Sequence, residues 1–292
     1  CIRDRTTTAA ALTSISTGLP PGEHGLVGYR FPAGGAVLNA LRWTVAGVDH
    51  RDAVAPRNVQ PAPAFAGGSW TVLSHRMFAR SAFTEAHLGD SRYVGYHHPS
   101  SIVADSRAAV ASGDRRVYAY YDGLDHVAHI HGVSGDHFRT ELAFCDWLVG
   151  SLIDALPTGT AVVVTADHGQ IDAPDLVELP AEVDELVAER SGEPRFRWLH
   201  ARAADPGPLL DLARELLADQ AWVLSVDEVV ELGILGPVVT EAARSRLGDV
   251  ALIARQPLGF ADPAERHADR LVGRHGSLTK AELEVPVLTA VA

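Results

Sequence analysis

The fold is best inferred from the segment Thr160-Ala-Val-Val-Val-Thr-Ala-Asp-His-Gly169. Its first six residues are almost wholly apolar and β-branched, which is typical of a strand buried on both faces of a parallel sheet. A second strand is predicted over 116–121, and apolar residues recur close to a helical period over 136–156. This order of strand, helix and strand indicates a βαβ unit, in which reactive groups collect beyond the carboxyl ends of the strands.

Further elements are predicted on both sides of this unit from apolar spacing and turn residues. Before it we expect a helix at 7–16, a turn-rich segment at 18–25, short strands or amphipathic segments at 36–43 and 70–73, and a helix at 105–112. After it we expect a helix-prone acidic stretch at 178–189, a strand at 195–200, a helix at 208–218, a strand at 221–225 and a helix at 226–232. Strands at 248–255 and 285–291 would then return to the main body.

The predicted order of elements divides the chain into two parts. Residues 1–170 and 246–292 form a catalytic α/β domain, and residues 171–245 form a small α+β insertion that resembles a cap. With 292 residues and 47% hydrophobic content, the chain is long enough to bury a substantial core. We therefore expect one large domain that carries an insertion.

The formal net charge of −12 bears on the class of partner. Binding along a nucleic-acid polymer is driven by Lys and Arg that displace counterions, so this charge disfavours it. A small anionic substrate would need a local positive centre, and bound metal ions can supply one without changing the acidic average.

Cysteine usage and hydropathy say little about the compartment. Cys1 and Cys145 make no disulfide framework. No apolar run approaches the roughly 20 residues of a membrane span, and no signal peptide is recognised, so a soluble chain is expected, with the cytoplasm slightly favoured. The chain opens on Cys1 without an initiator Met, which favours a missing upstream segment over a lipid-modified cysteine.

Three clusters of metal-ligand residues follow predicted strands or lie in loops. Asp125 and His129 follow the strand at 116–121 with a spacing of about one helical turn, so both could reach a single ion. Asp167 and His168 come directly after the strand at 160–165 and precede a glycine that permits a tight bend. His275 lies in the glycine-rich segment Gly273-Arg274-His275-Gly276, just ahead of the last strand.

Each cluster taken alone is better explained as a turn or a solvated loop, because Asp, His and Gly are common turn residues. Their joint occurrence near separate strand ends favours a metal centre. The other histidines lack this pattern. His97 and His98 are expected on the surface, His126 and His131 should point away from the first cluster, and His24 should make structural hydrogen bonds.

The run Thr6-Thr7-Thr8 at the start of the first predicted helix has two interpretations. A threonine there is ordinarily a helix cap. The same position suits a nucleophile, because the free backbone N–H groups at a helix N-terminus can receive a phosphoryl oxygen.

Taken in order, these motifs resemble the alkaline phosphatase superfamily and, within it, the nucleotide pyrophosphatase/phosphodiesterase family. The matching residues are Thr8, the segment from Thr17 to Gly25, Asp125 with His129, Asp167-His168-Gly169 and Gly273-x-His275-Gly276. The resemblance spans nearly the whole chain. It implies a three-layer α/β sandwich around a central, mostly parallel sheet, and a hydrolase of phosphodiester or pyrophosphate bonds in small, nucleotide-like substrates.

The resemblance also implies roles for individual residues. Thr8 would be the nucleophile and form a phosphothreonine intermediate. Asp125, His129 and His275 would hold one metal ion, and Asp167, His168 and Thr8 a second. The ions would be Zn²⁺, with Mn²⁺ as the weaker alternative.

The sequence departs from the family pattern in two places. The second site should include a carboxylate from a strand upstream of the nucleophile, and only seven residues precede Thr8. Tyr29 takes the approximate place of a phosphate-contacting asparagine, and its hydroxyl can still donate a hydrogen bond. A weakened second site is therefore expected in the 292 residues.

Three alternatives stay open: a phosphomonoesterase, a phosphonate hydrolase of the same superfamily, or a degenerate protein that binds a phosphorylated ligand without turnover. A sulfatase is disfavoured because the segment from Cys1 to Arg5 lacks the proline of the sulfatase motif.

Overall fold

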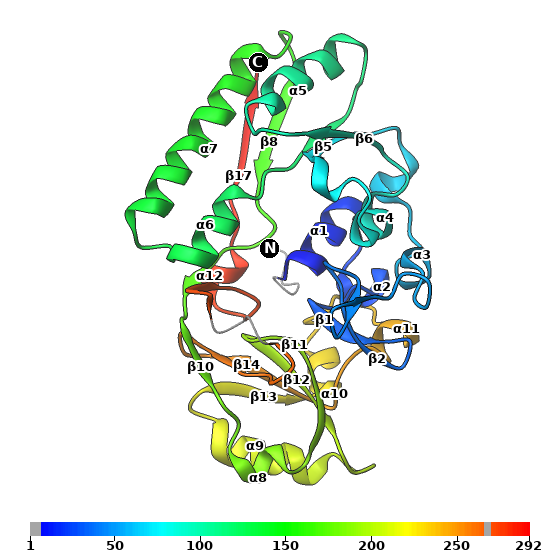
Figure 1. Cartoon of the computed structure of the whole chain (residues 1–292), viewed down its shortest axis with the longest axis vertical. Helices are drawn as coiled ribbons and strands as arrows, with labels where there is room; N and C mark the ends of the chain where they lie inside the picture. The colour runs from blue at the N-terminus through cyan, green and yellow to red at the C-terminus, as the bar shows by residue number, and fades with distance from the viewer. Residues whose placement is uncertain (1–6, 266–269) are drawn as a thin grey trace.

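A three-stranded parallel sheet, in the order β6-β5-β7, lies in the upper half of the molecule, where Figure 1 labels β5 and β6. The strands are β5 (Thr71–His75), β6 (Arg92–Tyr96) and β7 (Val117–Ala119). Four of the five residues of β5 are buried, as expected for the middle strand of a parallel sheet. The computed structural model describes residues 7–265 and 270–292, so Cys1 and the question of its modification lie outside the described residues.

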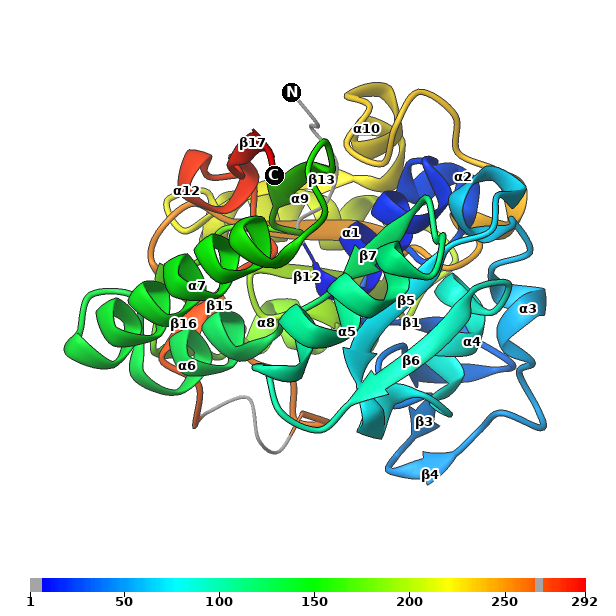
Figure 2. The same ribbon diagram turned by 90° about the horizontal axis from the view of Figure 1, so that it is seen from above.

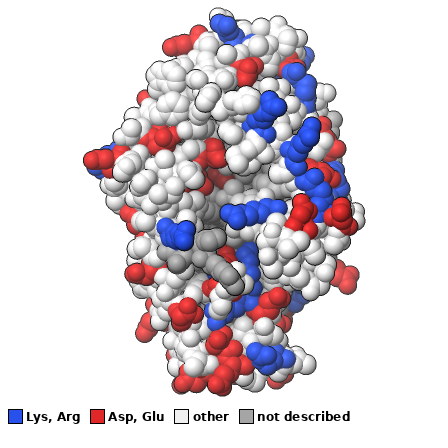
Figure 3. All heavy atoms as spheres, in the orientation of Figure 1, with Lys and Arg blue, Asp and Glu red and all other residues white. Residues whose placement is uncertain are grey.

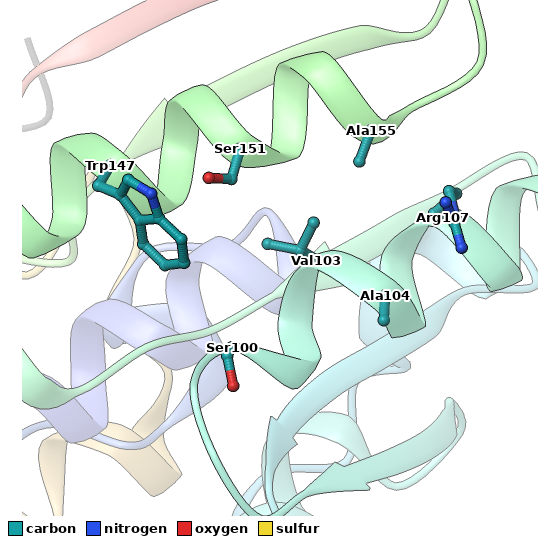
Figure 4. A pocket seen from close by; sticks show the side chains of 7 residues that line it. All are labelled: Ser100, Val103, Ala104, Arg107, Trp147, Ser151 and Ala155. Atoms are coloured by element: carbon teal, nitrogen blue, oxygen red, sulfur yellow. The ribbon is translucent and has the colours of Figure 1, made fainter.

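Helices cover this parallel sheet and extend beyond it. They are α4 (Ala82–Leu88), α5 (Ser101–Ala111), α6 (Gly123–His131) and α7 (Asp136–Ala155). Helix α7 packs against both α5 and α6, and Figure 2 shows α5 and α7 running side by side. Ser100, Val103 and Trp147 are among the residues that line a shallow groove between α5 and α7 (Figure 4).

The strand predicted at 160–165 forms, but its environment differs from the prediction. Strand β8 (Ala161–Thr165) pairs with β17 (Val287–Val291), and the two strands are antiparallel. Within the described residues these two strands make a separate sheet, and β8 is not hydrogen-bonded to β7. The prediction that both faces of β8 are buried was wrong, since Val163 is 65% exposed. Composition sets the preference for a strand, whereas its neighbours depend on distant parts of the chain.

A four-stranded antiparallel sheet forms the lower half, in the order β11-β12-β14-β13. Its strands are β11 (Val187–Glu193), β12 (Phe196–Ala201), β13 (Ala221–Ser225) and β14 (Val250–Ala254). We expected the strand at 248–255 to return to the main body. It instead lies between β12 and β13, because its apolar residues on alternate sides complete the cores on both faces of this sheet.

The two faces of the lower sheet bury different partners. Leu252 packs on the face covered by α8 (Ala181–Asp184) and α9 (Gly207–Leu217), whereas Trp198 and Ile253 pack in a core that includes α1 (Thr8–Thr17). The helix-prone stretch expected at 178–189 yields only the single turn of α8, since Val187 already begins the hairpin of β11 with β12. Figure 3 shows acidic side chains gathered at the lower end, over α8 and α9.

The remaining elements are short. Near the N-terminus lie α2 (Pro21–His24), a small sheet of β1 (Arg30–Ala33), β2 (Ala36–Asn39), β3 (Thr44–Val45) and β4 (Val48–Asp49), α3 (Pro56–Val59), and the 3₁₀ turns η1 (Ala64–Gly67) and η2 (Arg76–Phe78). Beside the lower sheet lie α10 (Val226–Glu231) and α11 (Glu241–Arg244).

Two short ladders connect the halves of the molecule. They pair β9 (Ile171–Asp172) with β16 (Gly273–Arg274), and β10 (Asp175–Val177) with β15 (Leu258–Phe260). A single turn, α12 (Lys280–Leu283), then leads into β17. Among the helices of the described residues, none has both the length and the apolar composition that a membrane span requires.

Candidate metal centre

The three predicted ligand clusters meet in the region between the two halves of the molecule. Asp125 and His129 lie on α6, one turn apart, so their side chains share a face of that helix. Asp167 and His168 follow the end of β8. His275 follows β16, which packs against α6.

Asp125, His129 and His275 form the most complete set of ligands. One donor atom from each residue lies within 4.8 Å of the other two. His129 Nε2 is 3.4 Å from Asp125 Oδ1, and the rings of His129 and His275 are 5.2 Å apart. Asp125 Oδ1 is buried without a hydrogen-bond partner, which is costly for a carboxylate oxygen unless a cation satisfies it. Two imidazoles and a carboxylate are a suitable donor set for a divalent ion such as Zn²⁺.

Neighbouring groups orient the ring of His129. Its Nδ1 lies 2.8 Å from the carbonyl oxygen of Gly273, which can only accept, so Nδ1 carries the proton. Nε2 is therefore the nitrogen with a free lone pair, and it faces Asp125. A backbone carbonyl that holds a histidine in this way is a frequent companion of a metal ligand.

A second group of residues lies beside the first. His168 Nε2 is 3.1 Å from Thr8 Oγ1 and 3.4 Å from Asp167 Oδ2. His168 Nδ1 donates to the carbonyl of Gly169 at 3.0 Å, which leaves Nε2 facing the threonine and the aspartate. The ring of His168 also stacks on His275, with centroids 3.5 Å apart. The two groups are thus adjacent.

The nucleophile candidate occupies the first position of a helix. Helix α1 begins at Thr8, and Thr7 precedes it in an extended conformation without a side-chain cap. The first N–H groups of an α-helix have no partner within the helix and carry the positive end of its dipole. Thr8 Oγ1 therefore lies where an anionic oxygen would be stabilised.

The electrostatics of the centre favour a bound cation. Burial raises the pKa of the Asp167 carboxyl, His168 lowers it, and the nearby carboxylate of Asp125 raises it further. Burial and the charge of Asp167 together raise the pKa of Tyr118 above its usual value. Two carboxylates in a partly buried site repel each other, and a dication between them would remove that repulsion.

The backbone of Tyr29 is linked through Glu193 to the loop that carries His275. Its backbone N–H donates to Glu193 Oε2 at 3.2 Å. A Cβ atom on Gly276, next to His275, would lie 2.8 Å from Glu193 Cγ. Glu193 thus connects the Tyr29 segment to the His275 loop. Sequence reasoning missed Glu193 because it lies within the segment interpreted as a cap and belongs to no motif.

The histidines set aside on sequence grounds lie where a structural or surface role was expected. His24 is buried, with Nε2 near Ser14 Oγ at 3.1 Å and Nδ1 accepting from the Leu26 N–H at 3.1 Å. His97 and His98 are exposed. His131 is exposed and stacks on His137.

This α/β fold, with a hydroxyl, two carboxylates and three imidazoles gathered between its two halves, is that of a hydrolase of the alkaline phosphatase superfamily. More specifically, the chain belongs to the type I phosphodiesterase / nucleotide pyrophosphatase family, whose sequence profile matches residues 5–277. No curated protein sequence matches the chain significantly.

Solved structures support the same fold. Murine ectonucleotide pyrophosphatase/phosphodiesterase 5 superposes with a TM-score of 0.74 at 16% identity, covering 97% of this chain and 76% of its own. An inactive form of that protein, in complex with AMP, superposes with a TM-score of 0.72 at 15% identity, and the same shares of the two chains are covered. Phosphonoacetate hydrolase from Sinorhizobium meliloti 1021, in complex with phosphonoacetate, gives 0.68 at 17% identity and covers 97% of this chain and 78% of its own. At these identities the likeness establishes the fold alone.

Proposed function

We propose that this protein is a divalent-metal-dependent hydrolase of phosphodiester or pyrophosphate bonds in small, nucleotide-like substrates, with Thr8 as its nucleophile. The observation that carries the proposal is the position of Thr8 Oγ1, 3.1 Å from His168 Nε2 at the N-terminus of α1. Membership of the type I phosphodiesterase / nucleotide pyrophosphatase family supports the reaction class.

Two sets of residues would hold metal ions. Asp125, His129 and His275 would form the first site, and Asp167, His168 and Thr8 the second. Carboxylate and imidazole donors favour Zn²⁺, with Mn²⁺ as the alternative. The chemistry that such ions supply when bound is neutralisation of phosphoryl charge and acidification of a hydroxyl group.

The residues of the chain account for substrate binding and bond cleavage. The N–H groups in the first turn of α1 would donate to a phosphoryl oxygen. Thr8 Oγ1 would then attack phosphorus while the bond to the leaving oxygen breaks, which gives a phosphothreonine. Attack of water on that phosphothreonine releases the phosphate product and restores the hydroxyl of Thr8.

Tyr29 would take part in substrate recognition. It is half-buried, and the Glu193 contact holds its backbone beside the His275 loop. A phenolic hydroxyl can donate a hydrogen bond to a phosphoryl oxygen, as the amide of an asparagine can. We propose this role for Tyr29.

A phosphonate hydrolase is the second candidate. It is favoured by the structural likeness to phosphonoacetate hydrolase, which matches over nearly the whole of this chain. In that case the bond broken would be carbon–phosphorus, and the same cluster of residues would be used.

Three substrates separate these functions. Turnover of bis(p-nitrophenyl) phosphate, p-nitrophenyl phosphate and phosphonoacetate would be measured with Zn²⁺ and again after chelation. We expect the diester to be cleaved fastest and the chelator to abolish turnover. Fastest cleavage of phosphonoacetate would establish the second candidate, and activity that survives complete metal removal would contradict both.

A further inference from the structure

A fully buried ion pair connects the candidate centre to the lower sheet. Arg195, directly before β12, donates from Nε to Glu282 Oε1 at 2.7 Å and from Nη2 to Glu282 Oε2 at 2.8 Å. Its Nη1 donates to the carbonyls of Gln256 and Leu258 at 2.8 and 2.7 Å. A guanidinium with this many partners holds a carboxylate in one orientation. The side chain of Glu282 is therefore fixed in one orientation inside the molecule.

The carboxylate of Glu282 holds the loop that carries His275. Its Oε1 accepts the backbone N–H of Ser277 at 2.9 Å, and its Oε2 accepts the hydroxyl of Thr279 at 2.5 Å. Ser277 lies two residues after His275 and also donates from its hydroxyl to the Ala254 carbonyl at 2.5 Å. The carboxylate of Glu282 thus helps to hold the path of the loop beyond His275.

The backbone of the same residue holds the loop that carries His168. The carbonyl of Glu282 accepts the N–H of Gly169 at 2.9 Å. The approach is so close that a Cβ atom on Gly169 would lie 2.0 Å from the Ala281 carbonyl oxygen. Glu282 consequently contacts both loops whose histidine rings stack on each other.

We propose that Glu282, oriented by Arg195, is a positioning residue for His168 and His275 and thereby sets the divalent-metal affinity and turnover of the centre. The inference rests on the proposed function, because it assigns those two histidines to the metal sites. Groups that orient metal ligands affect affinity strongly, since a ligand displaced by even a fraction of an ångström loses much of its bond to the ion.

The test compares two double variants of the complete protein. Arg195→Met with Glu282→Leu removes the ion pair and the acceptor for Ser277, and apolar replacement of a buried pair is often neutral for stability. Arg195→Met with Glu282→Gln keeps an amide oxygen that can accept the Ser277 N–H. Both variants lack the charges, so a difference between them reports the hydrogen bond to the loop.

Zn²⁺ affinity and kinetics are the two readouts. For the leucine variant we expect Zn²⁺ affinity, measured by competition with a chromogenic chelator, to fall roughly ten- to one-hundred-fold. Its kcat for the diester at saturating Zn²⁺ should fall about tenfold, with little change in KM. The glutamine variant should regain most of the Zn²⁺ affinity and most of the kcat. Equal Zn²⁺ affinity in the wild type and both variants would overturn the proposal.

Controls separate folding from positioning. Arg190→Met with Asp184→Leu removes another pair with a buried arginine from the same sheet, and this pair touches neither histidine loop. We expect wild-type Zn²⁺ affinity from it. If the leucine variant does not fold, Glu282→Asp serves instead, because it keeps the charge but draws the carboxylate back from Ser277; unchanged Zn²⁺ affinity there would also overturn the proposal. Absence of Zn²⁺ binding or turnover in the wild type would instead contradict the proposed function itself.

Discussion

The imidazole ring of His168 lies 3.5 Å from that of His275, and the two ring planes are inclined by only 10°. His168 reaches this position from the end of β8, and His275 reaches it from the end of β16. The contact brings the group of Thr8, Asp167 and His168 next to the group of Asp125, His129 and His275. It directly links two sets of residues that the chain places far apart.

Replacement of Thr8 by alanine should remove catalysis and spare the fold. If Thr8 Oγ1 is the attacking atom, turnover of the diester should fall at least about 10³-fold. The change removes one half-buried hydroxyl, so the free energy of unfolding should change by about 1 kcal/mol or less. Steady-state kinetics and urea denaturation measure the two effects.

Thr7→Ala is the matched control for this prediction, since Thr7 is the neighbouring residue and its side chain makes no cap hydrogen bond. We expect it to keep turnover within a few-fold of wild type. A Thr8→Ala variant with near-normal, metal-dependent turnover would exclude Thr8 as nucleophile.

Replacement of His275 by alanine should reduce the zinc content of the protein by one ion per chain at the first site. The reason is that Asp125 and His129 alone offer only two ligands, fewer than a stable zinc site requires. Elemental analysis after dialysis against dilute Zn²⁺ measures the stoichiometry. His131→Ala provides the comparison, because His131 is exposed and stacks on His137. Unchanged zinc content in the His275 variant would remove this residue from the ligand set.

Metal removal should destabilise the wild type more than the Asp125→Asn variant, because the variant loses the first metal site. A ligand that binds only the folded state at 100 times its Kd contributes about 2.7 kcal/mol. In the metal-free protein, Asp125 and Asp167 repel each other, so neutralising Asp125 should raise the Tm of the metal-free form. Thermal unfolding of both proteins, with Zn²⁺ and with chelator, tests both statements. A metal-free variant less stable than the metal-free wild type would show that this repulsion is not significant.

Stability should fall as the pH is lowered, because two buried histidines must stay neutral. Burial lowers the pKa of His24 from 6.5 to about 3 and that of His87 from 6.5 to about 4. A lowered pKa in the folded state means that the unfolded state binds the proton more tightly. The free energy of unfolding is therefore at its full value above about pH 6.5, and it decreases as the pH falls towards the pKa of each histidine in the folded state.

Each of these histidines contributes a slope of up to about 1.4 kcal/mol per pH unit between pH 6.5 and its folded pKa. His87→Leu should therefore make the pH dependence of the unfolding free energy shallower by about one proton, as measured by urea denaturation at several pH values. His87 donates from Nδ1 to the Phe83 carbonyl, so some overall loss of stability is also expected. The same slope in variant and wild type would contradict this assignment.

Much of the candidate site could be predicted because its candidate ligands belong to short local patterns. The spacing of Asp125 and His129 indicates a shared helix face, and α6 provides that face. Asp167 and His168 follow a run of β-branched residues that does form a strand. Helix α7 was predicted almost to the residue, since its apolar period over 136–156 is long and regular.

The errors concern residues whose environment depends on distant parts of the chain. Strand β8 forms as predicted, yet its pairing with β17 and its exposed Val163 follow from where the last residues of the chain lie. Strand β14 was assigned to the wrong half because a short apolar strand carries no signal of which sheet it joins.

The sequence by itself determined the elements, the family motifs and the residue types available for metal binding, because these depend on local backbone preferences and on side-chain chemistry. Only the tertiary structure showed that His168 stacks on His275, that Gly273 orients His129, and that Glu282 joins the two histidine loops. The contacts of His168 with His275, of His129 with Gly273 and of Gly169 with Glu282 link residues from about 100 to nearly 150 positions apart, and Glu282 belongs to no motif. Contacts of this kind arise when a chain folds to bury its apolar surface and must at the same time satisfy its buried polar groups.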